Sequence, residues 1–143
     1  MKFFLNVLFA LISLNMLSCQ RVKKSDVPKA VKATFEAKYP GEDDPDWRLD
    51  RNDNFESHFK INGEHYRADF SPNGNWIETE RNIKKKELPK IIREKLKSDY
   101  DDYKIVEIEV VDHHSKGIFY DVELKKDGKK QDIEFTIKGE IIN

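Results

Sequence analysis

The chain has 143 residues, with 26 basic and 27 acidic side chains and a formal net charge of −1. This balance leaves no strongly basic stripe, which argues against nucleic-acid binding. Because there is a single cysteine, no internal disulfide can form, and the hydrophobic core must hold the fold together.

The N-terminal segment has the pattern of a secretory signal peptide. Lys2 precedes an apolar run from Phe3 to about Leu17, which is shorter than the roughly 18 residues that a membrane span needs. A buried N-terminal helix is the alternative, but such a helix needs a polar face, and this run has almost none. We therefore expect residues 1–18 to be removed when the protein is exported.

A cysteine follows this segment directly. The tripeptide Leu17-Ser18-Cys19 resembles a bacterial lipobox, in which the chain is cut before the cysteine and its sulfur receives a diacylglycerol. A free thiol and an intermolecular disulfide are the alternatives for Cys19. Gln20 stands where an aspartate would retain a lipoprotein at the inner membrane. We therefore expect a lipid anchor in the cell envelope, at the outer membrane and facing the periplasm, with residues 19–26 as lipidated cysteine and polar tether.

The rest of the chain contains an internal repeat. Residues 27–39, VPKAVKATFEAKY, recur 61 residues later at 88–100 as LPKIIREKLKSDY. Both segments place apolar side chains at helical spacing and end at a tyrosine, which predicts two similar helices. Further along, residues 69–74 match 134–139 at a spacing of 65. The domain of residues 27–143 therefore divides into repeat 1, about 27–82, and repeat 2, about 88–143.

Each repeat also contains a hairpin signal. Asn62-Gly63 and Asp127-Gly128 lie between runs of alternating apolar and polar residues, which predicts tight two-residue turns. This register collects the apolar side chains on one face of each hairpin and the charged ones on the other. The apolar set is Phe55, Phe59, Ile61, Tyr66 and Phe70 in repeat 1 and Tyr120, Val122, Leu124, Ile133 and Phe135 in repeat 2.

These elements predict an α+β fold. Each repeat supplies a helix followed by four strands, and the two tandem repeats form one antiparallel sheet with both helices on its apolar face. Two copies are too few for a solenoid, so we expect one pseudo-symmetric domain whose halves share a core. In that core, Phe35, Phe59 and Phe70 would be buried beside Leu96 and Phe135.

The order of several short motifs resembles one family. The motifs are Val27-Pro28 with Tyr39-Pro40, Trp47, Asn73-Gly74-Asn75-Trp76, Leu88-Pro89, and Phe135 with Gly139. They resemble the PepSY-like group of small exported bacterial proteins, described as beta-lactamase-inhibitor-like, and the signal segment is similar to those of Bacteroidetes-type lipoproteins. The resemblance covers nearly the whole chain after that segment. It implies the doubled helix-and-sheet fold and an exported, non-catalytic, protein-binding role, while "inhibitor-like" refers to the fold.

The hairpin around Asn73-Gly74 offers candidate contacts for a partner. Pairing Phe70 with Ile77 places Trp76 on the polar face of the sheet, and Ile141 is its equivalent in repeat 2. An exposed aromatic side chain on an open sheet face is a typical interface anchor, although Trp76 could instead fold over the sheet edge. We predict that an unknown protein or envelope partner contacts Trp76, Ile141, Arg67 and His58.

The polar face of the second hairpin suggests a different ligand. Asp121, Glu123, Asp132 and Glu134 cluster on it, and like charges placed opposite each other destabilise a sheet. The cluster could meet a basic partner or a divalent cation such as calcium, or it could keep this face soluble together with the flanking lysines. A small-ligand or calcium-binding protein is therefore the alternative function, and no cofactor is expected otherwise.

Catalytic motifs are missing from the sequence. Apart from Cys19 there is no thiol nucleophile, and the serines lie in no Gly-x-Ser-x-Gly turn. Neither a His-Glu-x-x-His zinc motif nor a glycine-rich phosphate loop occurs. We therefore expect no enzyme but an exported, lipid-anchored binding module that recognises a protein or envelope component through the open face of its sheet.

Overall fold

The computed structural model describes residues 20–42 and 44–143, and the predicted signal segment and Cys19 lie outside them. Two α-helices, eight β-strands and two short 3₁₀ turns follow one another in this part of the chain. The elements are β1 (Gln20–Val22), η1 (Lys24–Asp26), α1 (Lys29–Lys38), β2 (Asp46–Leu49), β3 (Phe55–Ile61), β4 (Glu64–Phe70), β5 (Trp76–Asn82), η2 (Lys85–Glu87), α2 (Lys90–Asp99), β6 (Lys104–His113), β7 (Gly117–Lys126) and β8 (Lys129–Thr136).

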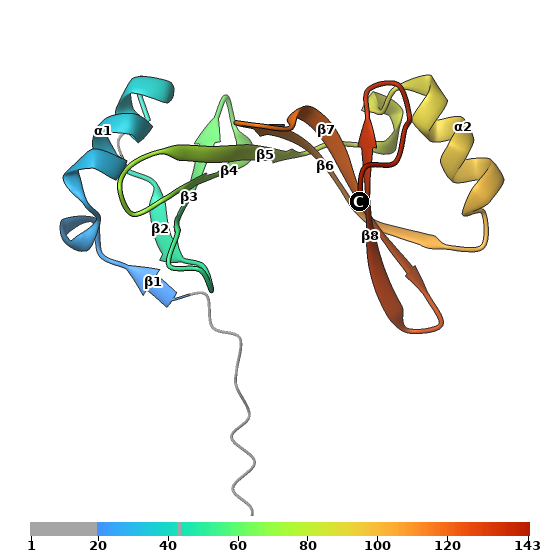
Figure 1. Cartoon of the computed structure of the whole chain (residues 1–143), viewed down its shortest axis with the longest axis horizontal. Helices are drawn as coiled ribbons and strands as arrows, with labels where there is room; N and C mark the ends of the chain where they lie inside the picture. The colour runs from blue at the N-terminus through green and yellow to red at the C-terminus, as the bar shows by residue number, and fades with distance from the viewer. Residues whose placement is uncertain (1–19, 43) are drawn as a thin grey trace, which may run out of the picture.

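The eight strands form one sheet in which neighbours in sequence are neighbours in space, from β1 to β8, and all pairs are antiparallel. Both helices lie on the same side of this sheet, α1 near its first strands and α2 near its last (Figure 1). The α+β architecture with both helices on one face is therefore confirmed. Repeat 2 deviates in its fourth strand, which is reduced to a single bridge between Phe135 and Ile141.

The two helices are built in the same way. Each begins directly after a proline, Pro28 or Pro89, which has no N–H to leave unpaired and whose ring fixes φ at the entry to the helix. Each helix ends at the tyrosine of the repeat. The backbone N–H of this tyrosine donates to the carbonyl oxygen of the residue four positions earlier, Phe35 in α1 and Leu96 in α2. The buried stripe is Val31 and Phe35 in α1 and Ile92 and Leu96 in α2.

The turn that leads into β5 recurs near the C-terminus, and each copy supports a helix. Gly74 has a φ of 91°, and a Cβ there would lie 2.8 Å from the backbone and Cβ of Ala30 in α1. Gly139 has a φ of 78°, and its Cβ would lie 3.2 Å from Ile91 in α2. At Gly74 the backbone of Ala30 leaves no room for a side chain, and at Gly139 the positive φ favours glycine while the side chain of Ile91 could yield. The repeat in the sequence is thus reproduced in its helix–turn contacts.

Each repeat has its own hydrophobic core. In repeat 1 the ring centroid of Phe35 lies 5.1 Å from that of Phe59 and 5.4 Å from that of Trp47. In repeat 2, Leu96 and Phe135 belong to a separate cluster of buried residues. The prediction that the two halves share one core is therefore wrong.

The reason lies in the two strands that join the repeats. On their helix side, β5 and β6 place Thr79 opposite Asp112 and Arg81 opposite Val110. Polar side chains thus occupy the middle of a face that is apolar at both ends. Backbone pairing of β5 with β6 connects the repeats, and each helix packs on its own cluster.

The predicted register is confirmed for the hairpin of β3 and β4, where Phe55 pairs with Phe70. It is wrong for β4 and β5. An irregularity between Asp69 and Phe70 places Phe70 opposite Trp76, one residue away from the expected partner. Because an extra residue on one strand shifts the alternation of faces, Trp76 lies on the helix side of the sheet and not on its polar face.

The segment expected to be a tether is part of the sheet. Gln20 pairs with Leu49 and Val22 pairs with Trp47, which makes β1 an edge strand. Val22 packs against the core of repeat 1, and this contact explains why a short polar segment is ordered. The tether prediction is therefore wrong for residues 20–22, which form β1. Within the described residues, no helix is long and apolar enough to cross a membrane.

Candidate functional site

The side of the sheet without helices is called the open face below. In Figure 1 the strands at both ends slope away from the helices, so this face lies on the inner side of an arch. Successive side chains of a strand point to opposite faces, and the polar members of the predicted pattern point to this one. The pairs His58–Arg67 and Glu123–Asp132 lie there in the predicted register.

Arg67 on β4 is the centre of a group of charged side chains on the open face. Strand pairing places it between His58 of β3 and Glu80 of β5. Its Nη2 donates to Glu80 Oε1 at 2.5 Å, and its Nε lies 3.7 Å from Asp69 Oδ1. The charge of Glu109 on β6 also acts on the guanidinium. We call Arg67, Asp69, Glu80 and Glu109 the Arg67 cluster.

Two carboxyl groups of this cluster are buried although no helix covers their face. Asp69 and Glu80 are each only 7% exposed. Burial raises the pKa of Asp69 to about 7 and that of Glu80 to about 8, although the adjacent Arg67 acts in the opposite direction. Burial and the charge of Glu107 likewise raise the pKa of Glu109. One guanidinium faces more carboxyl groups than it can neutralise, so the cluster retains protons near neutral pH.

Some buried polar atoms of the cluster have no hydrogen-bond partner. Within the described residues they include Arg67 Nε, Asp69 Oδ1 and Glu80 Oε2. Most buried polar groups of native proteins are paired, so unpaired ones need an explanation. Arg67 Nε and Asp69 Oδ1 face each other at 3.7 Å, beyond hydrogen-bond distance, and Glu80 Oε2 is an acceptor without a donor among the described residues.

A hollow of about 270 Å³ opens beside the cluster. Both His58 and Arg67 line it, so two of the four predicted contact residues share one site. His58 Nε2 lies 3.4 Å from Glu56 Oε2, while burial and the charge of Arg48 lower the pKa of the imidazole. The negative side of the lining consists of Glu80, Glu107 and Glu109.

A small apolar patch on the open face was missed by sequence reasoning. Val111 of β6 and Phe119 of β7 are paired neighbours there, and both are buried. Lys116 Nζ lies 4.9 Å from the centroid of the Phe119 ring. The sequence contains a pattern that predicts this patch. Val110-Val111 and residues 118–120 are runs of consecutive apolar residues, which indicate burial on both faces of a strand.

The other two predicted contacts, Trp76 and Ile141, do not lie on the open face. The indole Nε1 of Trp76 donates to Thr79 Oγ1 at 3.0 Å, and Lys38 Nζ lies 3.5 Å from the ring centroid. This side chain packs against the core of repeat 1. Ile141 pairs with the core residue Phe135, so it shares the helix side, where it is 43% exposed. The two positions are equivalent as predicted, but the predicted face is wrong because the bulge in β4–β5 was not foreseen.

The carboxylates of the second hairpin lie opposite one another as predicted, Asp121 with Glu134 and Glu123 with Asp132. Lysines of the same chain already meet Glu134 and Glu123, each at 2.7 Å. Burial and the charges of Asp132 and Glu134 raise the pKa of Asp121 to about 6. Nowhere in the described ranges do three His, Cys, Asp or Glu side chains group so that they could hold a metal ion. The geometry therefore gives the calcium alternative no support.

Comparison with known proteins identifies the family. A family model described as "Putative beta-lactamase-inhibitor-like, PepSY-like" matches residues 16–65 and 53–143. The chain belongs to this PepSY-like family. The resemblance inferred from the doubled motifs is thus confirmed. A search of curated proteins finds no match.

Solved structures from Bacteroides species share the fold of this PepSY-like protein. A DUF2874 family protein of Bacteroides uniformis has a TM-score of 0.73 at 22% identity, and the match covers 81% of this chain and 86% of that one. A "putative periplasmic" protein of Bacteroides eggerthii has a TM-score of 0.72 at 21% identity, with 82% and 86% covered. A BLIP-like protein of Bacteroides fragilis has a TM-score of 0.70 at 18% identity, with 81% and 83% covered. At these identities the likeness shows the fold alone.

Proposed function

We propose that this PepSY-like protein is an exported, lipid-anchored and non-catalytic binding module that recognises a protein or envelope component through its open face. The observation that carries the proposal is the Arg67 cluster, in which buried carboxyl oxygens such as Glu80 Oε2 have no hydrogen-bond donor on a face that no helix covers. The inhibitor-like description of the family and the BLIP-like neighbour support a binding role.

The Arg67 cluster supports a partner that carries positive charge. A lysine or arginine side chain that enters the hollow would donate to Glu80 Oε2, with Glu107 and Glu109 beside it. A cation at this place favours the ionised carboxylates, so binding would release the protons that burial retains. Complementary charges across an interface increase its specificity and its association rate. The proposed partner therefore presents a basic surface.

The start of the sheet is compatible with an anchor at Cys19. Because β1 begins at Gln20, a lipid on the preceding cysteine would hold the first strand at the bilayer surface without a flexible spacer. The signal-like sequence of residues 1–18 supports export. The Bacteroides eggerthii relative described as "putative periplasmic" supports an envelope location. The proposed location is the periplasmic side of the outer membrane.

Replacing Cys19 by Ala tests the anchor. The variant should appear in the soluble fraction or remain as the uncut precursor, because no acyl chain can be attached. Cell fractionation followed by mass analysis of the N-terminal peptide distinguishes these two products. Ser18→Ala keeps the cysteine and should stay with the membranes. If Cys19→Ala is processed normally and still sediments with membranes, another feature anchors the protein.

Charge reversal at the hollow tests the recognition surface. Glu107→Lys combined with Glu109→Lys should weaken the affinity of the immobilised protein for its envelope partner about tenfold or more, which corresponds to about 1.4 kcal/mol of binding free energy. The matched control is Glu36→Lys combined with Glu94→Lys, since both residues are exposed on the helices. Equal loss in the two double variants, or full retention in the first, would contradict recognition through the open face.

A further inference from the structure

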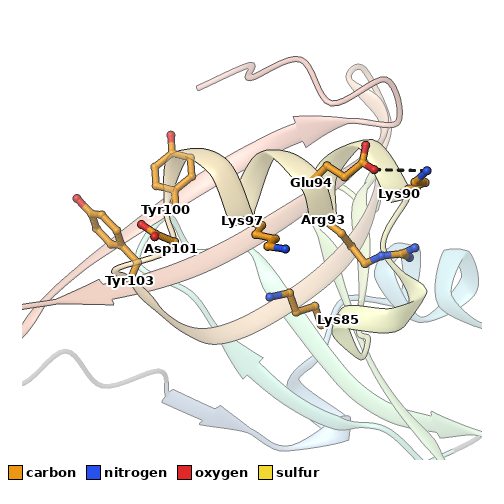
Figure 2. A pocket seen from close by; sticks show the side chains of 8 residues that line it. All are labelled: Lys85, Lys90, Arg93, Glu94, Lys97, Tyr100, Asp101 and Tyr103. Atoms are coloured by element: carbon orange, nitrogen blue, oxygen red, sulfur yellow. Dashed lines mark ion pairs between the residues drawn. The ribbon is translucent and has the colours of Figure 1, made fainter.

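A second hollow, of about 460 Å³, lies on the helix side of the molecule beside α2 (Figure 2). We call it the α2 hollow. Its lining comes from η2, from α2 and from the loop that follows α2. Four positive charges face two carboxylates there, and the basic residues are Lys85, Lys90, Arg93 and Lys97.

The positive charges of the α2 hollow are only partly compensated. Lys90 Nζ lies 3.4 Å from Glu94 Oε1. In the described part of the chain, the ammonium groups of Lys85 and Lys97 have neither an ion pair nor a hydrogen bond. Figure 2 shows both ammonium groups turned toward the same space. Because like charges repel, an anion bound between them would stabilise this arrangement.

Arg93 is held in a fixed position at the start of α2, with its guanidinium turned away from the ammonium groups of Lys85 and Lys97 (Figure 2). Its Nη1 donates to the backbone carbonyl of Lys86 at 3.0 Å and to that of Leu88 at 2.5 Å. These bonds orient the guanidinium without neutralising its charge. The charge of Arg93 therefore adds to the positive potential that attracts an anion to the hollow.

Two tyrosines complete the lining. The ring centroids of Tyr100 and Tyr103 lie 5.6 Å apart at an interplanar angle of 76°. Each tyrosine offers an apolar ring together with a hydroxyl group, so the pair can contact an organic ring that carries polar substituents. The volume of the hollow falls in the range of small-molecule sites and leaves room for an organic group beside a phosphate.

Repeat 1 provides an internal comparison at the spacing of 61 residues. Glu36 stands at the position of Lys97, so the charge is reversed there. Tyr39, the equivalent of Tyr100, is buried in the core of repeat 1. Lysines also stand in repeat 1 at the positions of Lys85, Lys90 and Arg93. Repeat 2 therefore differs from repeat 1 in the added charge of Lys97 and in the exposure of its tyrosine, not in the whole basic lining.

We propose that the α2 hollow binds a phosphorylated small molecule. Lys85 and Lys97 would hold the phosphate group, Arg93 would add its charge from the start of α2, and Tyr100 and Tyr103 would contact the organic part. The hollow lies on the opposite side of the sheet from the open face, so this binding is independent of the proposed partner recognition.

Calorimetric titration of the purified chain with glucose 1-phosphate tests the site. Binding should be observed, should weaken as salt is added, and should be absent with glucose. Lys85→Glu combined with Lys97→Glu should reduce the affinity about tenfold or more. Lys24→Glu combined with Lys29→Glu makes the same charge change in repeat 1 and should keep the wild-type affinity. All four lysines are exposed, so the variants should fold, which thermal melts verify.

A lipid could present the same phosphate chemistry, and vesicles distinguish this source. Sedimentation with phosphatidylglycerol vesicles, but not with phosphatidylcholine vesicles, would support the site with a lipid headgroup as ligand, provided that Lys85→Glu with Lys97→Glu abolishes it. Binding of glucose 1-phosphate that depends on the same lysines would support a soluble ligand. Failure of the wild-type chain to bind either probe, or equal loss in the two double variants, would overturn the proposal.

Discussion

Glu80 links the stability of the fold to pH. Burial raises its pKa to about 8 in the folded chain, whereas an unfolded glutamate titrates at about 4.3. Between these values the folded state holds a proton that the unfolded state has released. The retained proton therefore stabilises the folded state. This contribution to the free energy of unfolding is fully present below about pH 4 and is lost as the pH rises through about 8.

Replacing Glu80 by Gln should remove this contribution, because an amide keeps the shape of the side chain but does not titrate. Urea melts between about pH 5 and pH 9 should show that wild-type stability falls with pH, and the variant should reduce this slope by up to about 1.4 kcal/mol per pH unit. Asp69, whose pKa is raised to about 7, should leave a residual slope. Glu94→Gln, at an exposed position, serves as control. Identical slopes for wild type and Glu80→Gln would show that Glu80 is ionised in the folded state.

At the residue scale, the sequence predicted which residues pair across the first hairpin, but it did not predict which polar side chains are buried. Asn62-Gly63 fixed the turn of the first hairpin, so Arg67 and His58 were placed correctly on one face. Glu80 on β5 lies between Arg67 of β4 and Val111 of β6, and this arrangement of three strands is not encoded in a short segment. The bulge that turns Trp76 to the helix side could not be predicted from the sequence either. Trp76 and Ile77 are both apolar, so the sequence pattern does not show which of them faces the core.

At the scale of the elements, two separate cores predict local effects of core mutations. Phe70→Ala and Phe135→Ala each remove a fully buried ring and should each cost about 3–5 kcal/mol. Phe70→Ala should mainly accelerate amide hydrogen exchange in α1, and Phe135→Ala should mainly accelerate it in α2, because the two rings belong to different clusters. Mass spectrometry of exchanged peptides compares the helices within each variant. Equal acceleration of both helices in both variants would indicate one shared core.

The edge strand β1 shows how the repeat could have predicted more. Val22 and Ile83 are 61 residues apart, and each packs against the core of the repeat whose helix follows it. Ile83 directly follows β5, so extending the comparison upstream of Val27 would have assigned a strand to residues 20–22. The polar composition of this segment concealed the strand, because an edge strand needs few apolar contacts.

At the scale of the whole molecule, the two sides of the sheet differ in charge and in proposed ligand. The open face carries the buried carboxyl groups of the Arg67 cluster, while the α2 hollow carries the uncompensated Lys85 and Lys97. The doubled motifs predicted the fold and the family. They did not predict either surface, because both depend on which side chains of distant strands or turns are brought together.

Contact between the open face and a partner in the cell envelope can be read directly by photo-crosslinking. A crosslinking amino acid at His65 or Asp132 probes the open face, and one at Glu36 or Glu94 probes the helix side. All four side chains are exposed, so incorporation should not disturb the fold. We expect the two open-face positions to give adducts with the same envelope component and the two helix positions to give none. Adducts from the helix positions alone, or equal yields from all four, would contradict recognition through the open face.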